Sequence, residues 1–296
     1  MPPTFCHLCG SEIEGCGNLF HHPEWPNGQH VKVCYECTRT KPRCKKCGIP
    51  VVSFTAGGMC QTCVQIDNVC LTCGVKISGR YWEVDGTGPY CDRCTRERPP
   101  CEVCSAPLGK EHWRLSDGRV FCSHCRETGV FGIEDAKILY DESKRVVHQQ
   151  MGLTLNIPTA LVMVDRSQLA DVIKDQSNGS LQLDIDKTMG IYARRGMKRG
   201  IYVQTGLPRI LFLQVASHEY AHAWQGENCP LLRDITLREG FAEWVAYHVL
   251  GYYGYKDQMT RMKTRDDIYG RGLEMVLALE AKAGVAGVIE ACRSSR

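Results

Sequence analysis

Cysteine doublets dominate the first 125 residues of the chain. Sixteen of the nineteen cysteines form eight Cys-x-x-Cys pairs. Taken in order, neighbouring pairs make four quartets, with 24, 12, 17 and 17 residues between the two pairs of a quartet and six residues at each joint between quartets. Segments this short bury little apolar surface, so their fold has to depend on what the sulfurs bind.

The spacing predicts four structural zinc sites, in which the ion supplies the free energy that a small core lacks. A disulfide framework is the alternative. The N-terminus shows neither the charged nor the apolar region of a signal peptide, so we expect a reducing, cytoplasmic location. No run of about 18 apolar residues occurs, and we expect no membrane span. The predicted ligands are Cys6, Cys9, Cys34, Cys37, Cys44, Cys47, Cys60, Cys63, Cys70, Cys73, Cys91, Cys94, Cys101, Cys104, Cys122 and Cys125.

Two details of these sites stay open at the level of sequence. The equal gaps in the last two quartets favour sequential pairing, but a cross-braced pairing of alternate doublets fits the same spacing. Nearby histidines could also replace single cysteines, although we expect quartets of cysteine alone; these histidines are His21, His22, His30 and His124. Three cysteines fall outside the quartets and are expected to be inert thiols: Cys16, Cys229 and Cys292.

The second chemical motif reads His218-Glu219-Tyr220-Ala221-His222. A helix puts residues four apart on one face, so both imidazoles aim at one point. The surrounding apolar run predicts such a helix, with Pro208 suited to its first turn and Gly226 to its end. The pattern indicates a catalytic zinc site with Glu219 as the general base that takes a proton from the attacking water.

A third zinc ligand is expected downstream, where the chain reads Arg-Glu-Gly-Phe-Ala-Glu-Trp from position 238. On a helix, Glu239, Glu243 and Tyr247 share one stripe, and two like charges four residues apart favour a cation nearby. We therefore predict Glu239 as the ligand and Glu243 as the carboxylate that orients a ligand histidine. A chance five-residue match is the alternative reading of the motif. The donor that would stabilise the oxyanion stays open among Tyr247, His248, Tyr252, Tyr253 and Tyr255.

The fold class predicted from these patterns is an α+β zincin-like metallopeptidase domain preceded by an array of small zinc-ribbon or LIM-like modules. We place two modules in residues 1–66, two in 67–128 and the peptidase domain in 129–296. In that domain the pattern predicts helices at 134–150, at 167–174 with a serine cap, and at 271–292 as one helix or a pair. Strands are predicted at 159–165, 181–186 and 200–205. The last of these is either an edge that a peptide substrate could join or an interior strand.

Several segments together resemble the DA-one family of LIM-domain zinc peptidases, whose plant members are activated by ubiquitin and limit organ size. The similar segments are residues 113–119, 161–166, 205–209, 217–224 and 239–240. The resemblance implies a cytosolic zinc endopeptidase that cleaves regulatory proteins, with His218 and His222 as ligands and Glu219 as the catalytic acid/base. Two features depart from the family: the first doublet begins at Cys6, which leaves no room for ubiquitin-interacting helices, and the joints hold six residues instead of about two. Control by ubiquitin is therefore in doubt.

These observations favour a gluzincin-type endopeptidase with one catalytic and about four structural zinc ions, whose modules bind protein partners or substrates or regulate the enzyme. The alternative is an interaction scaffold with a non-catalytic C-terminal domain. Nucleic-acid binding is disfavoured, because the formal charge of +3 becomes about −3 once four thiolate sites and five divalent ions are counted. The basic cluster Arg194, Arg195, Lys198 and Arg199 is expected to be a solvated loop.

Overall fold

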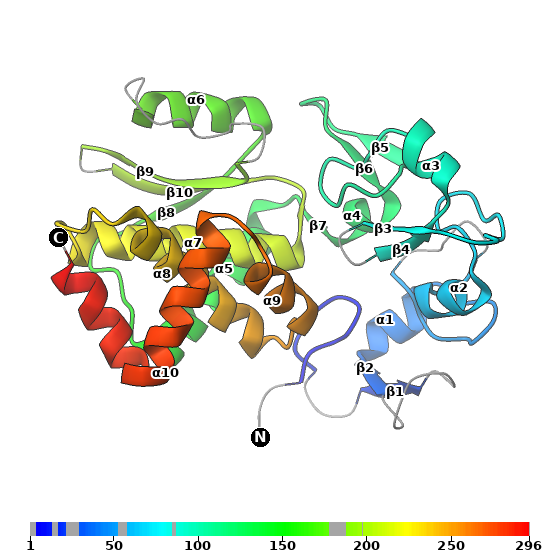
Figure 1. Cartoon of the computed structure of the whole chain (residues 1–296), viewed down its shortest axis with the longest axis horizontal. Helices are drawn as coiled ribbons and strands as arrows, with labels where there is room; N and C mark the ends of the chain where they lie inside the picture. Colours follow the sequence, from blue (N-terminus) through cyan, green and yellow to red (C-terminus); the bar gives the residue numbers. More distant parts are fainter. Residues whose placement is uncertain are drawn as a thin grey trace. The chain divides into compact units, whose positions relative to one another are not determined.

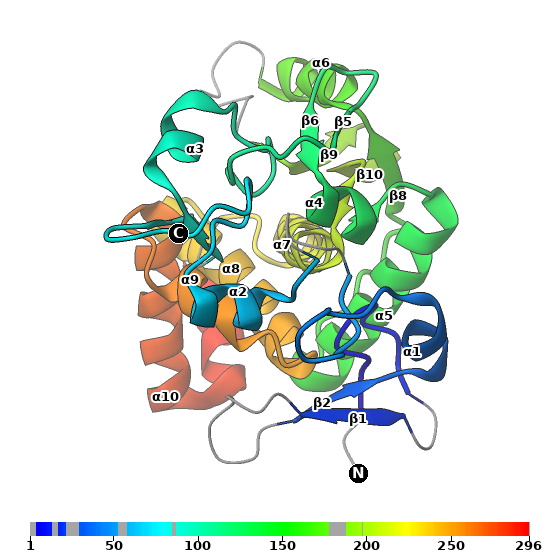
Figure 2. The same ribbon diagram turned by 90° about the vertical axis from the view of Figure 1, so that its right-hand side faces the viewer.

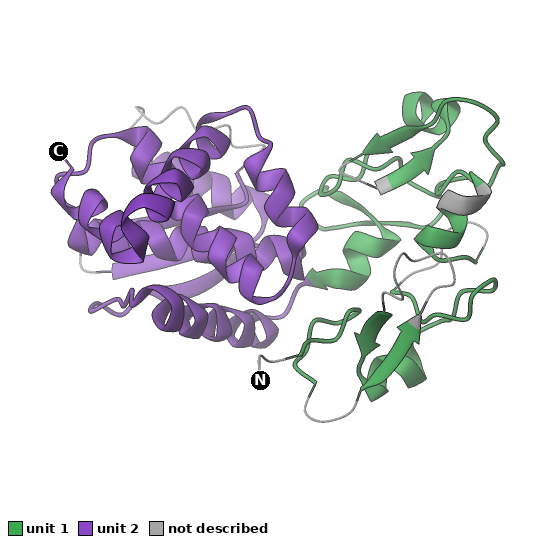
Figure 3. Ribbon diagram, turned by 60° about the horizontal axis from the view of Figure 1, so that its bottom comes forward, with its two compact units in different colours: residues 1–129 green, residues 130–296 purple. Residues whose placement is uncertain are grey.

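A computed structural model of the chain describes residues 4–13, 17–21, 30–52, 58–84, 87–177, 188–196 and 198–295. The chain divides into two compact units, Met1–Gly129 and Val130–Arg296, which are unit 1 and unit 2 in Figure 3. Unit 1 contains the cysteine doublets, and unit 2 contains the His-Glu-x-x-His segment. Within the described ranges, no helix has the length and apolar character needed to cross a membrane.

Unit 1 repeats one local structure, in which a turn around the first doublet of a quartet is followed by a short helix that carries the second doublet (Figure 1). In three quartets, a β-hairpin among the described residues lies between this turn and this helix. The hairpins are β1 (Asn18–His21) with β2 (His30–Val33), β3 (Trp82–Val84) with β4 (Thr87–Tyr90), and β5 (His112–Arg114) with β6 (Val120–Cys122). The helices are α1 (Tyr35–Thr40), α2 (Gln61–Asp67), α3 (Asp92–Glu97) and α4 (Ser123–Thr128).

A left-handed residue closes each first-doublet turn. Its N–H donates to the carbonyl of the first cysteine four positions earlier at 2.8–2.9 Å. The residues are Gly10, Gly48, Gly74 and Ser105, with φ of 70°, 72°, 73° and 57°. A side chain in this conformation costs about 1–2 kcal/mol, which explains why three of the four turns use glycine. The fourth module accepts this cost at Ser105.

Unit 2 is built on a three-stranded sheet with β10 (Lys198–Gln204) in the centre. β10 pairs in parallel with β8 (Ala160–Val164) and antiparallel with β9 (Gly190–Arg195). The sheet lies between α6 (Arg166–Ser177) and α7 (Arg209–Asn228), as Figures 1 and 2 show. Because β9 has only β10 as a neighbour among the described strands, its other side is an edge of the sheet.

The motif helix α7 runs through the middle of unit 2 and is seen end-on in Figure 2. Side chains around most of its circumference are buried, including Phe212, Leu213 and Trp224, as expected for a central helix. The Trp224 ring stacks on Phe241 of the next helix with 5.4 Å between centroids. The other elements are α5 (Ile133–Met151), α8 (Ile235–Tyr252), α9 (Lys256–Lys263), α10 (Ile268–Ser294), and the short strands β7 (Gly129–Val130) and β11 (Leu207–Pro208).

Helices α8 and α10 cross in direct backbone contact at two glycines. A Cβ placed on Gly240 would lie 2.4 Å from the carbonyl oxygen of Gly272, and one on Gly272 would lie 2.8 Å from the Cα of Gly240. No flexible side chain is available to move away at either point. This close approach fixes the spacing of the two helices beside Glu239.

Gly240→Ala is therefore expected to destabilise unit 2 by about 1–3 kcal/mol, because the added methyl group overpacks a backbone contact. Urea unfolding followed by tryptophan fluorescence would measure the loss. Gly251→Ala on the same helix is the matched control: Gly251 is exposed and its nearest neighbour is the flexible end of Met259, 3.2 Å from an added Cβ. Equal stability of the two variants would contradict this explanation.

Several helices differ in detail from the sequence predictions. α6 begins at Arg166, and its cap is Asp165, whose Oδ1 accepts the Gln168 N–H at 2.8 Å, so the predicted serine cap is wrong. Pro208 is the N-cap of α7, and the helix continues past Gly226 to Asn228. The predicted C-terminal helix is a pair, because the backbone of Gly284 is non-helical with φ of 67°.

The strands of unit 2 bear on two further predictions. Of the two alternatives for the segment 200–205, the interior strand is confirmed: residues 200–204 lie in β10, and the outer strands of the described sheet are β8 and β9. The basic cluster lies on β9 and β10 and not in a loop; Arg194 and Lys198 are exposed, whereas the Arg199 side chain is 9 % exposed and pairs with Glu227 at 3.1 Å. The strand predicted at 181–186 lies outside the described residues.

Candidate metal centres

The sixteen doublet cysteines gather into four clusters, each made of two doublets that follow one another in the chain. The clusters are Cys6/Cys9/Cys34/Cys37, Cys44/Cys47/Cys60/Cys63, Cys70/Cys73/Cys91/Cys94 and Cys101/Cys104/Cys122/Cys125, and the sulfurs of each lie within 4.8 Å of one another. The pairing is thus sequential and not cross-braced. Cysteine sulfurs alone make up these four clusters.

The sulfur spacing in each cluster fits a tetrahedral zinc ion. One recorded Sγ–Sγ contact per cluster measures 3.7, 3.6, 3.7 and 3.8 Å in chain order. Four sulfurs about 2.3 Å from a tetrahedral zinc ion are roughly 3.8 Å apart. The donor type and spacing therefore allow each cluster to bind zinc.

Backbone N–H groups support the sulfurs in the same way in all four clusters. The third cysteine of each cluster donates its N–H to the sulfur of the first, at distances from 3.1 to 3.4 Å. These donors offset part of the negative charge of a thiolate. The array therefore uses one binding geometry four times.

The second cluster shows why four thiolates at this spacing would need a cation. Burial raises the pKa of Cys47 to about 11, and the thiols of Cys44 and Cys60 add to the rise. Cys44 is also buried, but backbone N–H donors outweigh this and lower its pKa to about 6. Sulfurs packed this closely cannot all be thiolates unless a positive ion neutralises their repulsion.

The fifth candidate centre lies in unit 2 and joins His218 and His222 of α7 to Glu239 of α8. The two Nε2 atoms are 3.0 Å apart, and Glu239 Oε2 lies 3.4 Å from that of His218 and 3.2 Å from that of His222. Tetrahedral zinc with bonds of about 2.0–2.2 Å needs donor separations of roughly 3.3–3.6 Å. The three side chains need to move apart by only a few tenths of an ångström to hold a zinc ion, and they would leave one of its four positions for another ligand.

Neighbouring charged groups contact two of the three candidate ligands, Glu239 and His218. Arg238 donates through Nη2 and Nε to Glu239 Oε1 at 3.0 and 3.2 Å, so Oε2 is the oxygen directed at the histidines. Glu243 Oε1 lies 3.2 Å from His218 Nδ1, an ion-pair distance without the alignment of a hydrogen bond. Glu243 thus lies beside His218 without making the hydrogen bond that its predicted role requires, and the contact of Arg238 with Glu239 was not predicted.

Gln225 orients the second histidine, although the sequence analysis did not single it out. Its Oε1 faces His222 Nδ1 at 2.8 Å, and its Nε2 donates to the Arg238 carbonyl at 2.9 Å. Gln225 lies three positions after His222 on the same helix and is buried. That i, i+3 spacing was the available signal. Because Gln225 Oε1 accepts the hydrogen on His222 Nδ1, it fixes the tautomer of His222 that leaves Nε2 free to bind a metal ion.

Glu219 connects α7 to the edge strand of the sheet. Its Oε2 accepts the backbone N–H of Tyr192 in β9 at 2.7 Å, and its side chain is buried. That N–H points away from β10, so the carboxylate lies at the outer edge of β9. The predicted general base is therefore anchored next to the place where an extended chain could pair with the sheet.

The charge around the fifth centre favours a cation. Burial alone would lower the pKa of His218, but the carboxylates of Glu239 and Glu243 raise it to about 10. Burial also opposes ionisation of Glu239, yet the two histidines lower the pKa of its carboxyl group below the usual range. A proton or a metal ion at this point satisfies both carboxylates.

Tyr269, at the start of α10, is the tyrosine that stands beside the centre. Its ring centroid is 5.9 Å from that of His218, and the Arg265 guanidinium lies 4.7 Å from the ring centre. The candidates named from sequence have other surroundings. His248 contacts Glu280 at 3.0 Å and also the ring of Tyr247. Tyr253 donates to Glu142 at 3.2 Å. The rings of Tyr252 and Tyr255 pack on the ring of Tyr253.

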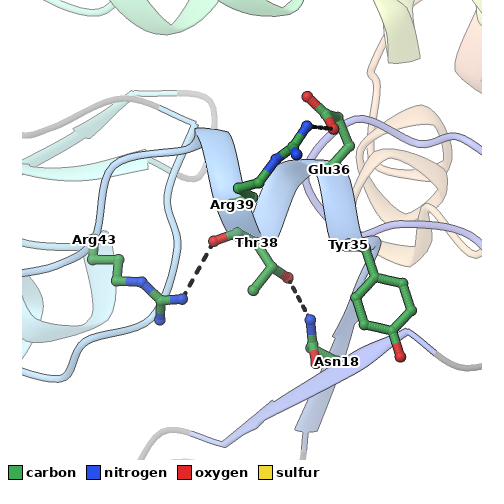
Figure 4. Close-up of a pocket in the computed structure, with 6 residues that line it drawn as sticks. All are labelled: Asn18, Tyr35, Glu36, Thr38, Arg39 and Arg43. Atoms are coloured by element: carbon green, nitrogen blue, oxygen red, sulfur yellow. Dashed lines mark hydrogen bonds and ion pairs between the residues drawn. The ribbon is translucent and has the colours of Figure 1, made fainter.

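A separate hollow lies in the first zinc module and is lined by Asn18, Tyr35, Glu36, Thr38, Arg39 and Arg43 (Figure 4). Its polar groups bind one another. Arg39 pairs with Glu36 at 2.9 Å, and Thr38 accepts a hydrogen bond from Asn18 at 3.0 Å. This hollow contains neither cysteine nor histidine and is not a candidate for chemistry.

Comparisons with family models, curated proteins and solved structures gave no match for this chain. The resemblance to the DA-one family therefore remains a prediction from the sequence segments that carry it. The four cysteine clusters, the His/His/Glu group and the α+β architecture of unit 2 stand on the geometry alone.

The clusters predict five zinc ions per chain, four in unit 1 and one in unit 2. Elemental analysis of the purified protein would count them, and two or fewer would contradict the assignment of the modules. The Glu239→Ala variant should bind four zinc ions, because the fifth centre loses its only carboxylate ligand. Glu274→Ala, which removes an exposed glutamate on α10, should still bind five.

Proposed function

We propose that unit 2 is a zinc-dependent endopeptidase and that the zinc modules of unit 1 bind its protein partners or substrates. The observation that carries the proposal is the convergence of His218, His222 and Glu239 with Glu219 anchored beside them. The ligand side chains retain 11–18 % of their surface exposed, so solvent and substrate can reach the point where they meet. Quartets of reduced cysteine fit a reducing compartment such as the cytoplasm.

A zinc ion bound at this centre supplies a Lewis acid that activates water and polarises a carbonyl group. The chain supplies the remaining functions. His218, His222 and Glu239 hold the ion, while Gln225 and Arg238 keep these ligands oriented. Glu219 takes the proton of the attacking water and delivers it to the leaving amine.

The outer edge of β9 supports a peptide substrate in particular, although the N–H groups of Tyr192 and Arg194 on this edge already donate to Glu219 and Gln176, so a paired peptide would depend on the other backbone groups of the edge. An extended chain can pair with a sheet edge through its main chain, which binds peptides with little dependence on their sequence. The Tyr192 N–H that anchors Glu219 lies on this edge, so a peptide paired there would pass the general base. We infer that the substrate lies along β9.

Tyr269 is our candidate for the donor that stabilises the oxyanion. Burial raises the pKa of its hydroxyl, and the Glu239 carboxylate adds to the rise, so the group stays protonated and able to donate at neutral pH. Tyr269→Phe is expected to lower kcat by about 10²-fold with little change in KM. Steady-state kinetics would measure this, with Tyr247→Phe as the control. A larger effect on KM than on kcat would contradict the role.

The proposed activity can be tested by incubating the zinc-loaded full chain with a library of unstructured peptides and identifying the new termini by mass spectrometry. Cleavage that is lost on chelation and restored by zinc supports the peptidase. A chain that holds five zinc ions and releases no products would favour the alternative, an interaction scaffold with a non-catalytic C-terminal domain.

A further inference from the structure

Two cysteines outside the quartets meet in the core of unit 2. Cys229 caps the C-terminal end of α7, and Cys292 lies in the last turns of α10, 63 positions later. Their Sγ atoms are 3.5 Å apart. Cys229 is 5 % exposed and Cys292 is fully buried, so the contact belongs to the packed interior.

The same pair is linked to the fifth metal centre through one side chain. Gln225 Nε2 lies 3.7 Å from Cys292 Sγ, and the Oε1 of the same amide faces His222. The guanidinium of Arg293 lies 5.3 Å from the ring centre of Trp224. The Cys292 thiol, and to a smaller degree the Arg293 charge, lowers the pKa of Cys229 against the effect of burial.

Metal binding does not explain this contact. A zinc site takes three or four protein ligands, and among the described residues Cys229 and Cys292 belong to none of the groups that could hold an ion. Packing as two small apolar side chains is the other reading. It accounts for their burial, and it also predicts that the two thiols do not react with one another.

We propose that Cys229 and Cys292 are a redox-active pair that closes to a disulfide when a peroxide oxidises it. The Cys229 thiolate attacks one peroxide oxygen, the O–O bond breaks, and a sulfenic acid and hydroxide form. The Cys292 sulfur then attacks the sulfenic sulfur and expels its oxygen as water. In total two thiols and one hydrogen peroxide give one disulfide and two waters.

Closure joins the end of α7 to the end of α10. The sulfurs move from 3.5 Å to the bonded distance of about 2.0 Å, a shift that side-chain rotation and small helix movements supply. Cross-linking residues this far apart in sequence restricts the unfolded chain, so unit 2 should melt at least about 5 °C higher when oxidised. This inference does not depend on whether unit 2 cleaves peptides.

The test treats the zinc-loaded full chain with hydrogen peroxide, blocks remaining thiols with N-ethylmaleimide under denaturing conditions, and digests with trypsin without reductant. Cys229 is the single cysteine of tryptic residues 210–233, and Cys292 is the single cysteine of residues 283–293. We expect these two peptides to appear joined, and to separate when a reductant is added.

Matched variants decide between the readings. Cys229→Ser and Cys292→Ser should each abolish the joined peptide and the rise in melting temperature, whereas Cys16→Ser should retain both. Recovery of both peptides with maleimide on each cysteine, at a peroxide concentration that already oxidises quartet cysteines, overturns the proposal. So does oxidation of either thiol to a sulfinic acid without cross-linking.

Discussion

Replacing Glu219 by glutamine is expected to lower the rate of peptide cleavage by about 10²–10⁴-fold while five zinc ions remain bound. The amide cannot accept the proton of the attacking water, but it has the size of the carboxyl group. Its oxygen can still accept the Tyr192 N–H that Glu219 Oε2 accepts at 2.7 Å, so the link between α7 and β9 should persist. Cleavage kinetics together with elemental analysis would separate loss of activity from loss of metal.

Glu274→Gln is the control for this experiment, because it makes the same change at an exposed position of α10. It should retain the native rate. A Glu219→Gln protein that cleaves peptides at the native rate would show that another group takes the proton, and the mechanism proposed for unit 2 would then be wrong.

Removing zinc with an excess of chelator is expected to unfold unit 1 and to leave most of unit 2 folded. The apolar clusters of unit 1 are small and consist largely of the cysteines themselves, as in the cluster of Cys44, Cys60 and Cys63. Structural zinc contributes on the order of 10–16 kcal/mol to comparable small modules, far more than such clusters can replace. Unit 2 has a core of its own that contains Phe241 and Trp244.

Hydrogen exchange read by mass spectrometry distinguishes the units in one sample. Amides of α1, α3 and α4 should exchange rapidly after chelation, while those of α7 and α8 should remain protected. Adding zinc back should restore protection in unit 1. Persistent protection of unit 1 in the metal-free protein would mean that apolar packing and not the metal holds the modules together.

Sequence spacing was sufficient to group the candidate ligands, because the geometry behind them is local. Two cysteines in Cys-x-x-Cys and two histidines four apart on a helix converge whatever the rest of the fold does. Glu239 required one further step, a second helix whose paired carboxylates favour a cation. The structure brings Glu239 within 3.4 Å of both histidine Nε2 atoms.

The groups that support these ligands could not be assigned, because their roles depend on tertiary contacts. The Tyr192 N–H reaches Glu219 across 27 positions, and Tyr269 reaches His218 from α10. Strand order was inaccessible for the same reason: the alternation in residues 200–205 identifies a strand but does not say which neighbours pair with it. Gln225 is different, since its position three residues after His222 was visible and its importance appeared only with the hydrogen bond.

The uniformity of the four cysteine clusters determines how zinc is distributed among them. Each offers the same four sulfurs and the same N–H support to its first cysteine. Sites this alike have similar affinities, so scarce zinc would be distributed among them statistically instead of in a fixed order. A zinc-starved preparation would then be a mixture of chains that differ in which modules are folded.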